Sequence, residues 1–234
     1  MVIGVRTKKI NGTYKDIVIK WNRMGQDIPG EDDSDELINA MAECKKVTEY
    51  LNLPVQSGDN EILKKMNRPY TIEKYKKIVK KIRKKIPNIT LSTDVIVGFP
   101  GENKKQFENT VKLFKEIKYD MAYIAKYSPR PGTAAAELED NVPPQEKKRR
   151  RKILSGILKQ TALEKNKEYI GKETKVLVEK QETSDKERIY FGKTRTYKTI
   201  KFQVPSSNSQ DLVGQFIKVK IIDITPWGLK GEVC

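Results

Sequence analysis

Three loops rich in glycine and proline carry the residue types in this sequence that could hold a small molecule. They are "QSG" at 56–58, "GFPGE" at 98–102 and "SPRPGT" at 128–133. Gly98 and Gly101 would let the backbone approach a ligand closely, and Pro100 would stiffen the turn. The carboxylate of Glu102 could accept hydrogen bonds from an amine or a ribose hydroxyl. The alternative is that these residues only form tight turns.

Several kinds of site are excluded. Neither G-x-x-x-x-G-K-[ST] nor G-x-G-x-x-G occurs in these loops, so a nucleotide held mainly by its phosphates is not expected. The chain has no histidine and only two cysteines, Cys44 and Cys234. A histidine general base, a Cys/His zinc site and a disulfide framework are therefore excluded.

The elements around these loops alternate between strand and helix. Strands are expected at 49–55, 90–99 and 121–128, and helices at 35–44, 59–66, 71–85 and 107–117. Ser34 and Thr71 are predicted N-caps, and Asn103 and Gln106 have capping-box spacing. This alternation predicts a parallel sheet of at least three strands, with the three loops together at the carboxyl ends of the strands.

The first 32 residues carry one short apolar run, Ile17–Trp21, which predicts a strand or ragged segment followed by a loop. The sequence assigns no function to this segment. A basic helix is expected at 145–169, with Ile153, Leu154, Ile157 and Leu158 as its apolar stripe. Its charged run Lys147–Arg151 fits either a solvated face or a surface that contacts phosphates.

From Gly171 onward the apolar period is two, which predicts a small antiparallel β-barrel. Lys193, Arg195, Tyr197 and Lys198 interleave basic and aromatic side chains, as oligonucleotide-binding barrels do. The alternative is a barrel that serves only as a packing module.

The net charge of +16 and the pI of about 9.6 favour a polyanionic partner, namely RNA, DNA or an acidic membrane surface. Because lysine is spread along nearly every predicted helix, part of the excess also fits a solvated surface. No apolar run is long enough to span a bilayer, and no signal peptide is recognised. A reduced, cytosolic protein is expected.

Three blocks carry a resemblance to a known family: "EYLNLPVQSGDNEILKKMNRPYTIEKY", "STDVIVGFPGENKKQFENT" and "AKYSPRPGTAAAEL". In this order, and followed by a β-barrel, they resemble the radical-SAM tRNA methylthiotransferases of the MiaB type, over roughly Ser34 to Glu232. The resemblance implies the C-terminal half of a partial (β/α) barrel at 33–166 and a TRAM domain, a small RNA-binding barrel, at 167–234. It also implies sulfur insertion and methylation at carbon 2 of isopentenyl-adenosine beside the tRNA anticodon.

The resemblance further implies S-adenosylmethionine and two [4Fe–4S] clusters as cofactors. By this resemblance Gln56 and Ser57 approach the methionine or ribose part of S-adenosylmethionine. Gly98, Phe99 and Pro100 likewise meet its adenine. The residues implied at the mouth that faces the substrate are Tyr127, Arg130 and Thr133, with Arg130 contacting a phosphate or base.

One departure from the family is large. The family holds its radical-generating cluster with C-x-x-x-C-x-x-C and a second cluster with three further cysteines, and neither set occurs here. The chain resembles a C-terminal portion of the enzyme and is not expected to catalyse the reaction alone. The alternatives are a non-catalytic RNA-binding remnant and two related branches, which modify threonylcarbamoyl-adenosine in tRNA or an aspartate of a ribosomal protein. A half barrel also leaves a sheet edge uncovered, which predicts self-association.

Overall fold

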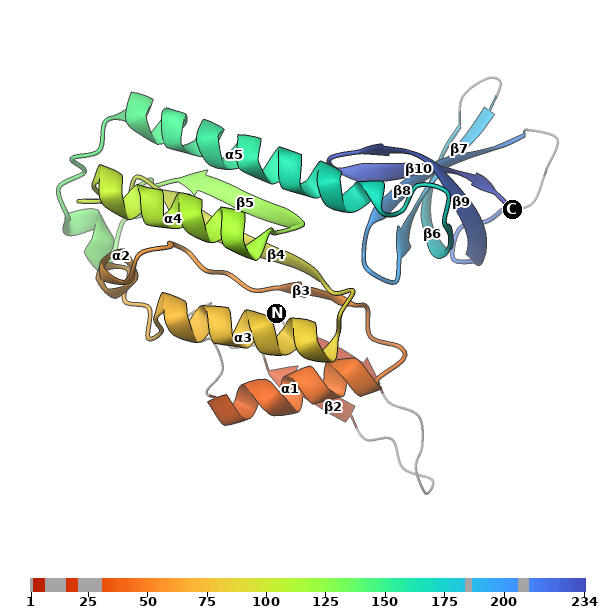
Figure 1. Ribbon diagram of the computed structural model, residues 1–234, viewed down its shortest axis with the longest axis horizontal. Coiled ribbons are helices and arrows are strands. Elements are labelled where there is room, and N and C mark those ends of the chain that lie inside the picture. The colour runs from red at the N-terminus through yellow and green to blue at the C-terminus, as the bar shows by residue number, and fades with distance from the viewer. Residues whose placement is uncertain (1, 7–15, 21–30, 184–186, 206–210) are drawn as a thin grey trace.

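The computed structural model describes residues 2–6, 16–20, 31–183, 187–205 and 211–234 (Figure 1). Its helices and strands follow one another as β1 (Val2–Arg6), β2 (Asp16–Lys20), α1 (Glu31–Glu43), β3 (Tyr50–Asn52), α2 (Asn60–Lys65), α3 (Ile72–Lys85), β4 (Thr90–Val97), α4 (Lys104–Ile117), β5 (Met121–Lys126), the 3-10 helix η1 (Ala134–Glu137), α5 (Pro144–Lys167), β6 (Glu173–Thr183), β7 (Glu187–Thr194), β8 (Thr199–Pro205), β9 (Phe216–Thr225) and β10 (Gly228–Val233).

The first part of the molecule is the predicted parallel sheet. Its strand order is β3-β4-β5, and each neighbouring pair is parallel. Because parallel neighbours need a crossover, α2 and α3 connect β3 to β4, and α4 connects β4 to β5. One apolar core joins the sheet to α1, α3, α4 and α5. The expected α/β class is confirmed.

Two of the three predicted helix starts are confirmed. Thr71 accepts a hydrogen bond from the Lys74 N–H, and Asn103 with Gln106 forms a complete capping box. The third is wrong, because α1 begins at Glu31 and contains Ser34. A serine is tolerated inside a helix, so its presence marks a possible start and not a required one.

The first 32 residues contribute an antiparallel pair, β1 and β2. The strand expected at Ile17–Trp21 corresponds to β2 up to Lys20, whereas Trp21 lies outside the described residues. The strand β1 was not predicted.

The long helix α5 connects the sheet to the second part of the molecule. Its 24 residues span about 36 Å at about 1.5 Å per residue. Leu154 and Leu158 are buried in the sheet's core, and Ile153 and Ile157 pack against it, which confirms the predicted stripe. No helix in the described ranges is long and apolar enough to cross a membrane.

The second part is a closed barrel with the strand order β10-β8-β7-β6-β9, as the period-two pattern predicted. All of its pairs are antiparallel except β10 with β8. It has its own apolar core, in which the rings of Tyr190 and Phe202 stack at 5.6 Å.

The barrel lies near the amino ends of the parallel strands. In Figure 1 the arrow of β5 points away from the barrel, and α5 runs back along the sheet toward it. The three predicted ligand loops follow the carboxyl ends of the strands, so they lie at the opposite end of the sheet from the barrel.

Candidate functional site

The three loops meet at one edge of the sheet, as predicted. Gln56 forms a parallel bridge with Val95, which joins the first loop to β4. The Tyr127 N–H donates to the Val97 carbonyl at 2.9 Å, and the Tyr127 ring packs edge-on against Phe99 at 5.1 Å. The edge therefore brings together Gln56, Phe99 and Tyr127 from three separate segments.

The first loop is tightly held by α4. Gln56 has a positive φ of 62°, and its side chain is half-buried. Ser57 is fully buried, and its hydroxyl accepts a hydrogen bond from the Asp59 N–H at 3.3 Å. A Cβ on Gly58 would lie 2.4 Å from the Thr110 Cα, while its N–H donates to the Thr110 hydroxyl at 2.9 Å. This glycine is needed because a neighbouring helix approaches it.

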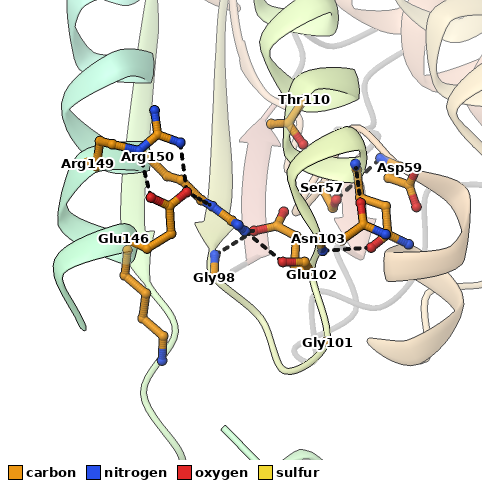
Figure 2. Close-up of polar contacts among 12 residues, drawn as sticks. Ser57, Asp59, Gly98, Gly101, Glu102, Asn103, Thr110, Glu146, Arg149 and Arg150 are labelled. Carbon is orange, nitrogen blue, oxygen red and sulfur yellow. Dashed lines mark hydrogen bonds and ion pairs between the residues drawn. The ribbon is translucent and has the colours of Figure 1, made fainter. Parts of the chain in front are cut away.

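The second loop is organised around Glu102, as Figure 2 shows. Glu102 Oε2 accepts hydrogen bonds from the Gly98 N–H and from Arg150 Nη1, both at 2.7 Å. The side chains of Arg150 and Glu102 are only 5% and 1% exposed. Burial raises the pKa of Glu102, and the Gly98 and Arg150 donors oppose that effect. The expected contact of Glu102 with a ligand is corrected here, because its carboxylate connects the loop to α5.

Gly98 is also required by contacts within the chain. Its φ is +70°, and a Cβ there would lie 2.4 Å from Lys147 Cγ. Phe99 and Pro100 are buried, and the Gly101 N–H donates to Asn141 Oδ1 at 2.8 Å. The alternative explanation, a turn shaped by the chain itself, accounts for Gly98 and Gly101 without a ligand.

The basic run at the start of α5 is partly internal. Lys147 Nζ lies 2.6 Å from both carboxylate oxygens of Asp140 and 5.1 Å from the Tyr127 ring centroid. Arg149 and Arg150 both donate to Glu146, and these hydrogen bonds lower its pKa to about 2. Lys147 and Arg150 are buried, so neither of the two earlier interpretations, solvated face or phosphate contact, applies to them.

Of the residues predicted around the third loop, one is bound within the chain and two are exposed. The Tyr127 hydroxyl donates to the Ala135 carbonyl at 2.6 Å. Arg130 and Thr133 are exposed, and the Thr133 hydroxyl donates to the Arg130 carbonyl at 2.8 Å. Within the described ranges the Arg130 side chain has no ion pair, so it is free to meet a partner.

Part of the barrel hairpin predicted to bind RNA is engaged within the chain itself. Lys198 Nζ donates to Asp120 Oδ1 at 2.8 Å, and the two side chains are 9% and 6% exposed. Arg195 Nε donates to Glu49 Oε1 at 2.7 Å, and Tyr197 stacks on Tyr50 with centroids 4.7 Å apart. The turn between β7 and β8 therefore docks against the sheet domain. This corrects the prediction for the buried Lys198, whereas RNA contact by Arg195 and Tyr197, which are 47% and 43% exposed, stays a prediction.

Lys193 is turned along the hairpin itself. Its Nζ donates to the Thr199 hydroxyl at 2.7 Å and lies 4.5 Å from the Tyr197 ring centroid. The docking partners Glu49, Tyr50 and Asp120 were missed by sequence reasoning, because they lie 78 to 147 residues before their partners and no local pattern marks them.

The chain does not fit an iron–sulfur cluster. Such a cluster needs several thiolates that converge on one point. Cys44 is half-buried after α1, whereas Cys234 is exposed at the end of the barrel. Among the described residues, no group of three potential metal ligands occurs. For S-adenosylmethionine the fit is limited, since Lys147 covers the Cβ side of Gly98 while Gln56 remains half-buried at the same edge.

The protein thus has two parts in sequence. The first is a parallel α/β sheet with glycine-bearing loops at its carboxyl ends, and the second is a closed five-stranded barrel. Two family models match the chain in that order, namely the radical SAM superfamily over residues 5–114 and the TRAM domain over residues 167–234. The first match includes part of the amino-terminal segment that received no role.

Comparison with curated proteins identifies relatives within the radical SAM superfamily. The chain is 47% identical over 202 residues to the tRNA-2-methylthio-N(6)-dimethylallyladenosine synthase of Clostridium botulinum (strain Langeland). It is 43% identical over 202 residues to the proteins of that name from Bacillus cereus (strain AH187) and Bacillus thuringiensis (strain Al Hakam). The matches cover 86% of this chain but 44% of the Clostridium protein and 39% of the Bacillus proteins, so the chain spans less than half of these relatives. The chain belongs to the MiaB-type radical SAM methylthiotransferase family with a TRAM domain.

Proposed function

We propose that this chain supplies the S-adenosylmethionine loops and the RNA-binding barrel of a tRNA methylthiotransferase. The proposed reaction is sulfur insertion and methylation at carbon 2 of isopentenyl-adenosine beside the anticodon, in the cytosol. The single observation that carries the proposal is the 47% identity over 202 residues to a synthase of that name. The cluster ligands would have to come from outside these 234 residues, since only two cysteines occur in them.

The cofactor part of the proposal places the methionine or ribose of S-adenosylmethionine against Gln56 and Ser57. Its adenine would lie near the backbone of Gly98, Phe99 and Pro100. The half-buried Gln56 side chain is the group at this edge that can be removed with the least damage, because glycine tolerates its positive φ.

The RNA part of the proposal places substrate at Tyr127, Arg130 and Thr133. The exposed Arg130 is the natural phosphate or base contact because its planar guanidinium can bind either bidentately. Since α5 spans about 36 Å, an RNA that contacts both this loop and the barrel must be at least of that length, which an anticodon stem-loop with its stem satisfies.

On the barrel, the proposed RNA surface consists of Lys175, Phe216 and Lys218. Lys175 pairs in register with Lys218 on the neighbouring strand, and its Nζ lies 4.9 Å from the Phe216 ring centroid. Phe216 is 62% exposed, and neither lysine has a carboxylate partner in the described part of the chain. An exposed ring beside two lysines on one face of the barrel suits a stacked base and its phosphates.

The test measures cofactor and RNA binding separately. S-adenosylmethionine binding to the full chain by equilibrium dialysis should be weakened by Gln56→Gly. Asn67→Gly, at an exposed position that also has a positive φ, serves as the control. Fluorescence anisotropy should show tighter binding of an anticodon stem-loop that carries isopentenyl-adenosine than of the unmodified one. Equal binding of both stem-loops, together with no cofactor binding, would contradict the proposal.

A second function, a non-catalytic RNA-binding remnant, is favoured by the missing cluster cysteines. It predicts RNA binding without cofactor binding in the same two assays. Preference for a stem-loop carrying threonylcarbamoyl-adenosine, or for the ribosomal-protein substrate, would instead assign the chain to one of the related branches. Self-association through the uncovered sheet edge stays a prediction, which sedimentation would test.

A further inference from the structure

A cavity of about 460 Å³ lies at the junction of the sheet and the barrel, away from all three loops. It is formed by the amino ends of the parallel strands, the end of α5 and the tip of the barrel hairpin. Its charged lining residues are Glu49, Arg83, Lys118, Asp120, Lys165, Glu168 and Lys172. No predicted cofactor or substrate residue is among them.

The charges of this cavity are unbalanced. Of its three carboxylates, Asp120 is already bound by Lys165 at 2.7 Å and by Lys198 at 2.8 Å. Glu49 is bound by Arg195 at 2.7 Å. Among the described residues, neither Lys118 nor Lys172 has a carboxylate within ion-pair distance. Glu168 is therefore the one lining carboxylate that remains to balance them.

Two cations of the cavity wall, Arg83 and Lys165, have defined partners in the fold. Arg83 donates from Nη2 to the carbonyls of Ile117 and Lys118, which fixes its guanidinium at the carboxyl end of α4. The pKa of Lys165 is lowered, first by burial and further by the positive charges of Arg83 and Lys198, although Asp120 opposes this. The cations on this wall repel one another, so an anion placed among them would be attracted.

We propose that this junction cavity binds a phosphate group. Lys118 and Lys172 would contact its oxygens from the rim, and the fixed guanidinium of Arg83 would donate from the wall. The volume exceeds that of a lone phosphate and fits either a phosphorylated small molecule of nucleotide size or a segment of an RNA backbone. The proposal is independent of the proposed function, because the cofactor loops lie at the other end of the strands.

Isothermal titration calorimetry of the full chain with inorganic pyrophosphate, at constant ionic strength and without divalent cations, tests the site. The double variant Lys118→Gln/Lys172→Gln should weaken binding at least about tenfold, because two charge-assisted contacts are lost. The matched control is Lys105→Gln/Lys112→Gln, which removes the same charge from exposed positions of α4. It should leave the affinity unchanged. Equal affinity in all three proteins, or no binding to the unaltered chain, would overturn the proposal.

A competition experiment identifies the source of the phosphate. If saturating tRNA abolishes pyrophosphate binding to the unaltered chain, the cavity takes an RNA phosphate. If pyrophosphate binds equally well to the tRNA complex, the cavity takes a phosphorylated small molecule. The double variant serves as the baseline in both arms.

Discussion

Lys198 of the barrel donates a 2.8 Å hydrogen bond to Asp120, the residue that immediately precedes β5 of the sheet. Lys165 of α5 donates to the other carboxylate oxygen at 2.7 Å. One buried carboxylate thus contacts the sheet, the connecting helix and the barrel. Because a buried charge is costly without its partners, this arrangement favours a single orientation of the barrel on the sheet.

Replacing Asp120 by asparagine should destabilise the chain by roughly 3–5 kcal/mol, because two lysines would lose the carboxylate that compensates their buried charge. The urea unfolding curve of this variant should also show two resolved transitions in place of one, because the sheet and the barrel have separate apolar cores. The control is Asp223→Asn, which breaks an exposed pair with Lys230 and should cost far less, because water screens that pair. Equal costs for both variants would contradict this role of Asp120.

The same carboxylate predicts an acid-dependent loss of stability. Burial raises the pKa of Asp120, but Lys198 and Lys165 outweigh burial and leave the pKa below its usual value. A carboxyl whose folded pKa is lowered stabilises the fold fully above the unfolded value of about 3.9, and this contribution is lost as the pH falls through the folded pKa. The stability difference between the unaltered chain and Asp120→Asn should therefore be constant from pH 7 to about 5 and shrink below about pH 4. A difference that stays constant down to pH 3 would refute the assignment.

Gly98→Ala should destabilise the chain more than Gly132→Ala. Both glycines have a positive φ near 70–80°, so both variants bear the backbone cost of about 1–2 kcal/mol. Only at Gly98 would the new Cβ meet Lys147, whereas nothing lies within 4 Å at Gly132. Thermal unfolding should show the difference, and in a double-mutant cycle Gly98→Ala should cost less in a Lys147→Ala background than in the unaltered chain. Identical costs at the two sites would show that Lys147 moves aside freely.

Lys175→Gln/Lys218→Gln should weaken tRNA binding and lower the salt slope by about 2, because each neutralised phosphate contributes about 0.9 to that slope. Arg195→Gln should leave the salt slope unchanged, since that side chain binds Glu49. Anisotropy across a salt series compares the variants. If Arg195→Gln alone lowers the slope, the hairpin contacts RNA and the surface proposed on β6 and β9 is wrong.

Features encoded by neighbouring residues could be predicted from the sequence alone. The Asn103–Gln106 capping box, the Thr71 cap and the buried stripe of α5 each depend on residues within a few turns of one another. The alternation of strand and helix, followed by period two, was enough to predict the parallel sheet and the barrel. The meeting of the three loops followed from the rule that parallel strands share one carboxyl edge.

Only the tertiary structure decided which side chains are free to meet a ligand. Glu102, Lys147 and Lys198 look like exposed charges in sequence, yet each is buried against a partner from another segment. Arg195 is bound to a carboxylate 146 residues earlier. The physical reason is that burial and ion pairing depend on which elements pack together, whereas local spacing determines only which element a residue joins and which face of it the residue occupies.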